Sequence, residues 1–94
     1  MNESPSKVTI EDLLSSRGRI RILIELAKAT ELNISELCRR VDLNHSSTKS
    51  HLDVLTRSGI IEEKKFGRIK IYRYKIEDLR ARSLKSLFDL WDSS

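Results

Sequence analysis

The sequence has one cysteine, one tryptophan, two tyrosines and two phenylalanines among its 94 residues. A single cysteine cannot form a disulfide within the chain, which indicates a reducing compartment. So few aromatic rings argue against a protein that stacks single-stranded bases on an aromatic platform. No apolar run approaches the roughly 20 residues that span a bilayer, and residues 1–7 lack the hydrophobic stretch of a signal peptide. We therefore expect a cytoplasmic protein with no membrane partner.

The residue combinations that enzymes require are also missing. Glu62 and Glu63 are neighbours in a predicted strand, so their carboxylates point to opposite faces and cannot act as an acid–base pair. His45 and His51 have no nucleophile and orienting acid at a recognisable spacing, and no glycine-rich phosphate loop is present. We therefore expect no enzymatic activity and no cofactor.

Positive charge is concentrated in the middle of the chain. Residues 59–76 contain six Lys or Arg and two acids, a net charge of +4, and residues 17–58 contain eight and five, a net charge of +3. The flanking segments 1–16 and 77–94 carry −2 and −1. A basic segment between near-neutral ends is typical of a protein that binds a polyanion. A solvated charged surface is the alternative interpretation.

Hydrophobic spacing and turn residues predict one small domain of five helices and a hairpin. We expect helices over 10–15, 17–29, 34–41, 45–58 and 77–91, with strands 60–65 and 69–76 joined by a tip at 66–68. Thr9, Asn33 and Asn44 are predicted helix caps, and Gly59 a helix end. The predicted core stripes are Ile20, Leu23, Ile24 and Ala27 on the second helix, Ile34, Leu37, Cys38 and Val41 on the third, and Thr48, Leu52 and Leu55 on the fourth.

Two short helices joined by a three-residue turn and followed by a basic hairpin have the order of a winged helix-turn-helix. The segment 43–61, LNHSSTKSHLDVLTRSGII, resembles the recognition helix of the arsenic-repressor (ArsR) type of winged-helix regulators. Residues 17–23 resemble the arginine-rich start of the second helix in that family, and the match covers about 60 residues. The family pattern is filled here by Ser46, Ser47, His51, Leu52, Val54, Leu55, Gly59, Ile60 and Ile61.

This resemblance implies a mainly α protein with a small β-hairpin, in which the N- and C-terminal helices serve dimerisation. It divides the chain into a flexible arm (1–8), a winged helix-turn-helix domain (9–76) and a dimerisation helix (77–94). It also implies a double-stranded DNA-binding transcriptional regulator. A winged-helix module for protein–protein interaction, or an architectural DNA binder of low sequence specificity, is the alternative.

Short polar side chains near a helix N-terminus can reach base edges and phosphates, and a basic hairpin can lie on the flanking backbone or in the minor groove. Lys49 can contact a guanine edge or a phosphate, and His51 either a phosphate, the wing or only its own helix neighbours. A well-capped helix and a charged hairpin that resists edge pairing are the structural alternatives. The expected DNA-binding residues are His45, Ser46, Ser47, Lys49, Ser50, His51 and Arg57 on the helix and Lys64, Lys65, Arg68 and Lys70 on the wing.

Some members of the family bind metal through a Glu-Leu-Cys-x-Cys segment, and Glu36-Leu37-Cys38 begins such a segment here. Arg39 and Arg40 follow, so the second thiolate is missing, and the last helix has no histidine for the other metal site of the family. A soft metal needs several converging thiolates or imidazoles. We therefore expect no metal, and we expect Cys38 to be a small buried hydrophobic residue.

The last helix carries an apolar stripe that can fold back on its own domain or pair with a second copy. Because the preceding elements already fill a small core, we expect a homodimer, with the contribution of the N-terminal helix left open. A helix lying on a membrane surface is a third interpretation, which Asp89 and Asp92 weaken. The expected interface residues are Leu79, Leu84, Leu87, Phe88 and Trp91.

Overall fold

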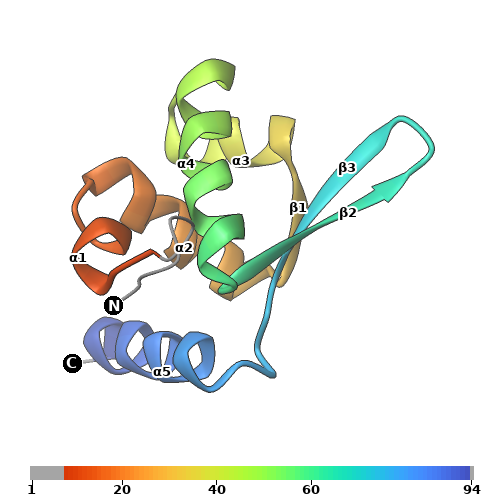
Figure 1. The fold of residues 1–94 in the computed structure, drawn as a ribbon. Coiled ribbons are helices and arrows are strands. Elements are labelled where there is room, and N and C mark those ends of the chain that lie inside the picture. The colour runs from red at the N-terminus through yellow and green to blue at the C-terminus, as the bar shows by residue number, and fades with distance from the viewer. Residues whose placement is uncertain (1–7, 94) are drawn as a thin grey trace, which may run out of the picture.

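The computed structural model describes residues 8–93, so the expected flexible arm lies, apart from Val8, outside the described residues. Within them no helix is both long and apolar enough to span a bilayer. Figure 1 shows the last helix lying beneath the others and a hairpin that projects to one side of the body. In chain order the elements are α1 (Ile10–Leu13), α2 (Arg17–Ala29), β1 (Glu31–Asn33), α3 (Ile34–Val41), α4 (His45–Ser58), β2 (Ile61–Phe66), β3 (Ile69–Tyr74) and α5 (Leu79–Ser93).

Side-chain caps fix where the helices begin. The side chains of Thr9, Asn33 and Asn44 each accept a hydrogen bond from the backbone N–H three residues further on. Asn33 forms a complete capping box with Glu36, whose carboxylate accepts the Asn33 backbone N–H at 2.9 Å. Gly59 ends α4 at a φ of +85°, a conformation that side chains with a Cβ rarely adopt. The predicted starts and ends of α2, α3 and α4 are therefore confirmed.

The buried face of α2 differs from the predicted one. Leu23 and Ala27 are buried as expected, but Ile20 and Ile24 are only half-buried, and their predicted places are taken by Ile22 and Leu26. Ile20 and Ile24 instead line a groove of about 230 Å³ against α5. The helix thus has two apolar faces, one toward the sheet and one toward α5, and a single periodic stripe cannot distinguish them.

The sheet has three strands rather than the two of the predicted hairpin. β1 pairs antiparallel with β3, with Leu32 opposite Tyr72, and gives the strand order β1-β3-β2. β3 ends at Tyr74, two residues before the predicted end. β1 has only three residues and one buried side chain, Leu32, so it carries no alternation that a sequence pattern can reveal.

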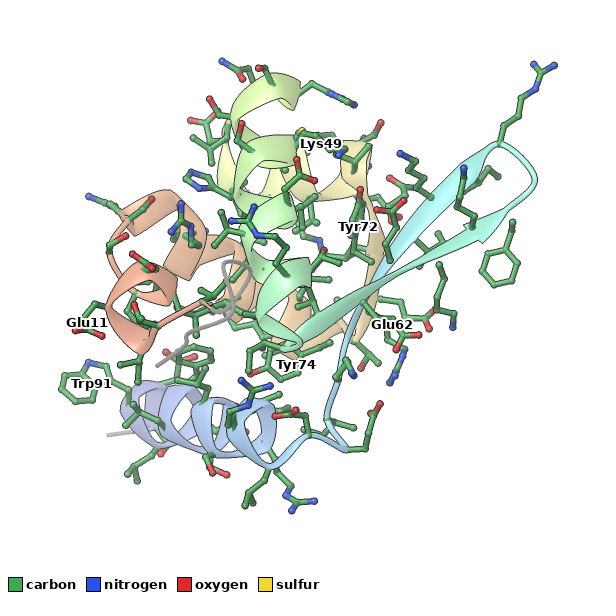
Figure 2. The ribbon with its side chains drawn as sticks, viewed as in Figure 1. Glu11, Lys49, Glu62, Tyr72, Tyr74 and Trp91 are labelled. Carbon is green, nitrogen blue, oxygen red and sulfur yellow. The ribbon has the colours of Figure 1, made fainter. Side chains whose placement is uncertain are left out.

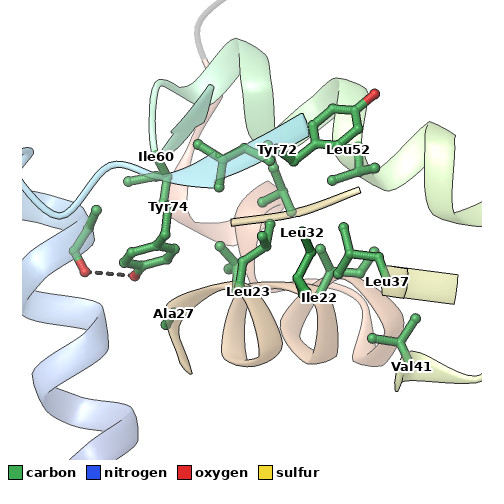
Figure 3. Close-up of a cluster of buried hydrophobic side chains, with 14 of the residues drawn as sticks. Ile22, Leu23, Ala27, Leu32, Leu37, Val41, Leu52, Ile60, Tyr72 and Tyr74 are labelled. Carbon is green, nitrogen blue, oxygen red and sulfur yellow. Dashed lines mark hydrogen bonds between the residues drawn. The ribbon is translucent and has the colours of Figure 1, made fainter. Parts of the chain in front are cut away.

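The core lies between the sheet and helices α2, α3 and α4, and Figure 3 shows its aliphatic side chains gathered around Tyr72 and Tyr74. The Tyr74 hydroxyl donates a 2.7 Å hydrogen bond to the backbone carbonyl of Ala81, which is completely buried. Burial raises the pKa of Tyr74 to about 12, so the hydroxyl keeps its proton and remains a donor. This bond fixes the first turn of α5 to the end of β3.

An arginine ties the base of the hairpin to the same turn. The Arg73 guanidinium on β3 lies 2.7 Å from carboxylate oxygens of both Glu62 on β2 and Glu77, just before α5. The hydrogen bonds from Arg73 lower the pKa of Glu77 to about 2, so this carboxylate stays charged at any ordinary pH. The orientation of α5 is therefore coupled to the sheet by polar contacts as well as by packing.

Candidate nucleic-acid interface

Helix α4 is anchored on one side and exposed on the other. Thr48, Leu52 and Leu55 are completely buried, as predicted, so this stripe turns the opposite side of the helix to solvent. The Asn44 side chain accepts the N–H of Ser47 at 2.7 Å, and the two preceding helical amides lie at the positive end of the helix dipole. The solvent side presents His45, Ser46, Ser50, Asp53 and Arg57 as exposed residues and Ser47 and Lys49 as half-buried ones.

The hairpin β2–β3, called the wing from here on, separates its lysines onto two faces. Lys65 lies opposite Lys70, and two residues along each strand Glu63 lies opposite Tyr72, which is buried beneath the helices. Because every second side chain of a strand lies on the same face, Lys65 and Lys70 lie on the same face of the sheet as Glu63 and Tyr72. Nearer the body of the domain, α4 covers this face. Lys64 lies on the other face, where its Nζ binds Glu31 of β1 at 2.9 Å and sits 5.7 Å from the centre of the Phe66 ring. Lys64 is therefore directed away from α4.

The wing turns through two residues at its tip. Phe66 lies opposite Ile69, which leaves Gly67 and Arg68 as the connection. Gly67 has a φ of +63° at the first turn position, the geometry that a tight hairpin reserves for glycine. Arg68 is exposed at the outermost point of the wing.

Some of the lysines expected to bind DNA form ion pairs with acidic side chains of the protein. The Lys49 Nζ lies 2.8 Å from the Asp53 carboxylate one turn later, and this hydrogen bond raises the pKa of Lys49. Figure 2 shows Lys49 on α4 close to Tyr72 of the sheet, on the side of the helix that faces the wing. Lys70 similarly lies 3.6 Å from Glu63. Exposed ion pairs of this kind contribute only about 0–1 kcal/mol, so a phosphate can replace the carboxylate.

Other cations of the surface carry no such partner. In the part of the chain that the structure describes, no ion pair involves Arg57, Lys65 or Arg68. These three side chains lie on α4, on the wing strand and at the wing tip, so they flank the exposed side of α4. The sequence identifies these cations but not the pairing of Lys64 and Lys70, because only the sheet register brings Glu31 and Glu63 to them.

His51 packs against α2 rather than against the wing. The Arg19 Nε donates a hydrogen bond of 3.4 Å to the His51 Nδ1, and a methyl group added at Gly18 would lie 3.0 Å from the Nε2. Burial, with a smaller effect of the Arg19 charge, lowers the pKa of His51 below its usual 6.5. The imidazole is therefore neutral at neutral pH and supports the junction between α2 and α4.

We expect acid to destabilise the domain through His51. Because the folded pKa of this histidine is lower than the unfolded value of 6.5, the unfolded chain binds more protons as pH falls below 6.5. The stability that neutral His51 provides is present above this pH and is lost as pH falls through the folded pKa. Urea unfolding at pH 7.5 and 5.0 measures the difference, which should shrink in His51→Gln and persist in His45→Gln, a change at an exposed position. An unchanged difference in His51→Gln would refute this assignment.

Cys38 joins the two helices of the helix-turn-helix. Its thiol donates to the Thr48 Oγ1 at 3.4 Å, and that hydroxyl donates to the Asn44 carbonyl at 2.9 Å. Cys38 is half-buried rather than buried as predicted, because it lies at the edge where α3 meets α4. Among residues 8–93 no three His, Cys, Asp or Glu side chains come together in a way that could hold a metal ion.

A second surface, formed by α1 and α5, is apolar. Leu79, Leu87, Leu90 and Trp91 of α5 and Ile10 of α1 are exposed, with Trp91 at 77% of its full accessibility. Figure 2 shows Trp91 at the far end of α5, pointing away from the body. By contrast, Leu84 and Phe88 pack against the core. The predicted interface stripe therefore divides into an inner edge that holds α5 to its own domain and an outer edge that faces solvent.

Comparison with known proteins places this geometry among regulators. The sequence model described as "Bacterial regulatory protein, arsR family" matches residues 16–63, from the cap of α2 into β2. The cadmium resistance transcriptional regulatory protein CadC of Listeria innocua is 26% identical over 85 residues, which cover 90% of this chain and 70% of CadC.

The fold is also found in solved structures. HlyU from Vibrio cholerae superimposes with a TM-score of 0.77 at 22% identity, covering 90% of this chain and 89% of HlyU. The winged helix-turn-helix DNA-binding domain of Mb0332 from Mycobacterium bovis, described as homodimeric, has a TM-score of 0.72 at 20% identity and covers 89% and 75% of the two chains. At these identities the likeness concerns the fold alone.

Proposed function

This chain belongs to the arsR family of bacterial regulatory proteins and is a DNA-binding transcriptional regulator, and we propose that it holds duplex DNA with α4 in the major groove and the wing on the flanking backbone or minor groove. The observation that carries this assignment is the orientation of α4. Its apolar stripe is completely buried, and its serine-rich side faces solvent between cations on the helix and on the wing. A recognition helix needs this arrangement, because one side must be held rigidly while the other contacts base edges.

The proposed contacts divide by chemistry. Ser46, Ser47 and Ser50 present hydroxyls, and His45 presents a ring, to base edges and to phosphates near the start of α4. Lys49 and Lys70 reach DNA by leaving Asp53 and Glu63. Arg57, Lys65 and Arg68 contact phosphates directly. His51 and Lys64, engaged with Arg19 and Glu31, support these contacts from behind.

We further propose that two copies associate through the exposed apolar surface of α1 and α5. The neighbouring groove, about 730 Å³ between these helices and the end of α4, is lined mainly by aliphatic side chains and would be closed by a second copy. A two-fold dimer would present two α4 helices to half-sites about 34 Å apart on one side of the duplex. The homodimeric description of the Mycobacterium bovis domain is consistent with this arrangement.

A mobility-shift titration with genomic DNA fragments at two salt concentrations tests the function, followed by sequencing of the fragments that bind most tightly. We expect binding that weakens as salt increases and that selects a two-fold symmetric sequence. Failure to bind at low salt would overturn the DNA-binding assignment. Equal binding to all fragments would instead favour an architectural DNA binder.

The wing tip offers a matched pair of variants. Arg68→Ala should lower the slope of log affinity against log salt by about one unit, because one phosphate contact is lost, and should weaken binding to all sequences alike. Lys64→Ala removes the same charge from the same wing but from the face opposite α4, where Lys64 pairs with Glu31, so its slope should stay that of the parent protein. Equal slopes for Arg68→Ala and the parent would show that the tip does not touch DNA.

A further inference from the structure

A cleft lined by arginines lies on the side of α4 away from the wing. It has a volume of about 510 Å³ and separates the first turns of α2 from the turn that joins α3 to α4. Figure 1 shows the start of α2 and the wing on opposite sides of α4. Arg17, Arg21 and Arg40 line the cleft, and we call it the arginine cleft. Neither the recognition helix nor the wing includes it.

A shared acid holds two of these arginines in place. The Glu25 carboxylate lies 3.6 Å from the Arg21 guanidinium and 3.5 Å from that of Arg40, and Arg21 also donates to the Arg40 backbone carbonyl at 3.3 Å. The Glu25 side chain is 13% exposed, whereas those of Arg21 and Arg40 are 43% and 47% exposed. Glu25 therefore fixes both guanidiniums from below. Each guanidinium has five N–H groups, so donors remain for a ligand above them.

The charge in the cleft favours an anion. Arg17 is exposed and, within residues 8–93, takes part in no ion pair, while Glu25 and Asp42 are the only acids against the three arginines. The positive end of α2 adds to this excess: the Ser16 hydroxyl accepts the N–H of Arg19, and the amides of Arg17 and Gly18 precede it. Guanidinium groups bind phosphate in a planar, two-pronged geometry that a lysine ammonium cannot provide.

We propose that the arginine cleft binds a phosphate of the DNA backbone, so that the duplex is held at both edges of the groove that α4 enters. This inference rests on the proposed function. The cleft is well placed for it, because Asp42 and Leu43 belong to the turn that leads directly into α4, and Arg21 and Arg40 join that turn to α2. The wing secures one edge of the site, and the cleft secures the other.

The salt dependence of binding tests the proposal, using the DNA fragments selected above. Arg17→Ala should lower the slope of log affinity against log salt by about one unit, and Arg17→Ala with Arg40→Gln by about two. Lys28→Ala is the matched control, because it removes an exposed cation from the other end of the same helix and should leave the slope unchanged. Arg68→Ala reports on the wing in the same assay. If Arg17→Ala keeps the parent slope while Arg68→Ala lowers it, the cleft does not bind DNA although the proposed function holds. If the parent protein binds no DNA at all, the proposed function itself fails.

A free phosphate or a phosphorylated small molecule has the same chemistry as a backbone phosphate, and two further measurements separate these sources. In duplexes that carry one neutral methylphosphonate linkage beside the α4 site, the linkage that Arg17 contacts should weaken parent binding and leave Arg17→Ala unaffected. Inorganic phosphate titrated into DNA-free protein at constant ionic strength should give no saturable shift of the Arg17 and Gly18 amide resonances at millimolar concentrations. A saturable shift, with equal effects of every methylphosphonate on both proteins, would overturn the DNA assignment in favour of a small-anion site.

Discussion

Replacing Leu87 and Trp91 together by lysine is expected to convert the proposed dimer to a monomer and to weaken binding to a paired half-site by about 100-fold or more. Both side chains lie on the outer edge of α5, where Leu87 is 49% exposed and Trp91 77% exposed in a single copy. In the dimer each lysine would have to lose its water in a largely apolar seam, at a cost of several kcal/mol. Each monomer then binds a single half-site, and the gain in affinity from binding the second half-site intramolecularly is lost. Light scattering measures the mass, and mobility shifts on single and paired half-sites measure the affinities.

The inner edge of α5 and an exposed position on α3 supply the controls for this experiment. Leu84 and Phe88 pack on the core of their own domain, so lysines there would unfold the protein rather than separate two copies. Ser35→Lys adds a lysine at an exposed position on α3, outside the α1 and α5 surface, and should leave the dimer intact. A Leu87→Lys, Trp91→Lys protein that remains dimeric would place the interface elsewhere. A monomer that still binds paired half-sites as tightly as the parent would show that the dimer does not bring the two α4 helices together.

The boundaries of α2, α3 and α4 could be predicted from the sequence because they depend on local chemistry, whereas α1 ends at Leu13, two residues before its predicted end, and α5 begins at Leu79, two residues after its predicted start. Asn33 and Asn44 cap their helices by accepting the backbone N–H of the residue three positions later, and Gly59 adopts the positive φ that ends α4. The buried stripe of α4 follows in the same way, since Leu52 and Leu55 recur at helical spacing and only one side of the helix is apolar. The residues of α4 that are expected to contact DNA are those on the side opposite this buried stripe.

What the sequence could not predict depends on pairings between distant segments. β1 exists because Leu32 is opposite Tyr72, forty residues later in the chain, and not because three residues prefer an extended conformation. The same register decides that Lys64 meets Glu31 while Lys65, its neighbour, takes part in no ion pair among residues 8–93. The arginine cleft is a similar case, because Arg21 and Arg40 are nineteen residues apart and are joined by Glu25 only after α2 and α3 pack.

Leu52→Ala is expected to lower the free energy of unfolding by about 2–5 kcal/mol. Leu52 is completely buried in the stripe that attaches α4 to the domain, so its removal leaves a cavity directly behind the recognition surface. A domain of this size has only about 5–10 kcal/mol of stability in all, so this loss is a large share. Urea unfolding measures it, at one fixed protein concentration because the stability of a dimer depends on concentration.

The matched variant Val54→Ala removes two methyl groups from a half-buried position on the same helix and should cost less than half as much. A Leu52→Ala protein as stable as Val54→Ala would mean that this stripe does not anchor α4. Leu52→Ala, studied at a temperature where it stays folded, should keep the parent salt slope because every phosphate contact remains, whereas Arg68→Ala should keep the parent stability and lose slope. If Leu52→Ala changes only the stability and Arg68→Ala changes only the salt slope, the two assays separate the residues that position α4 from the residues that touch DNA.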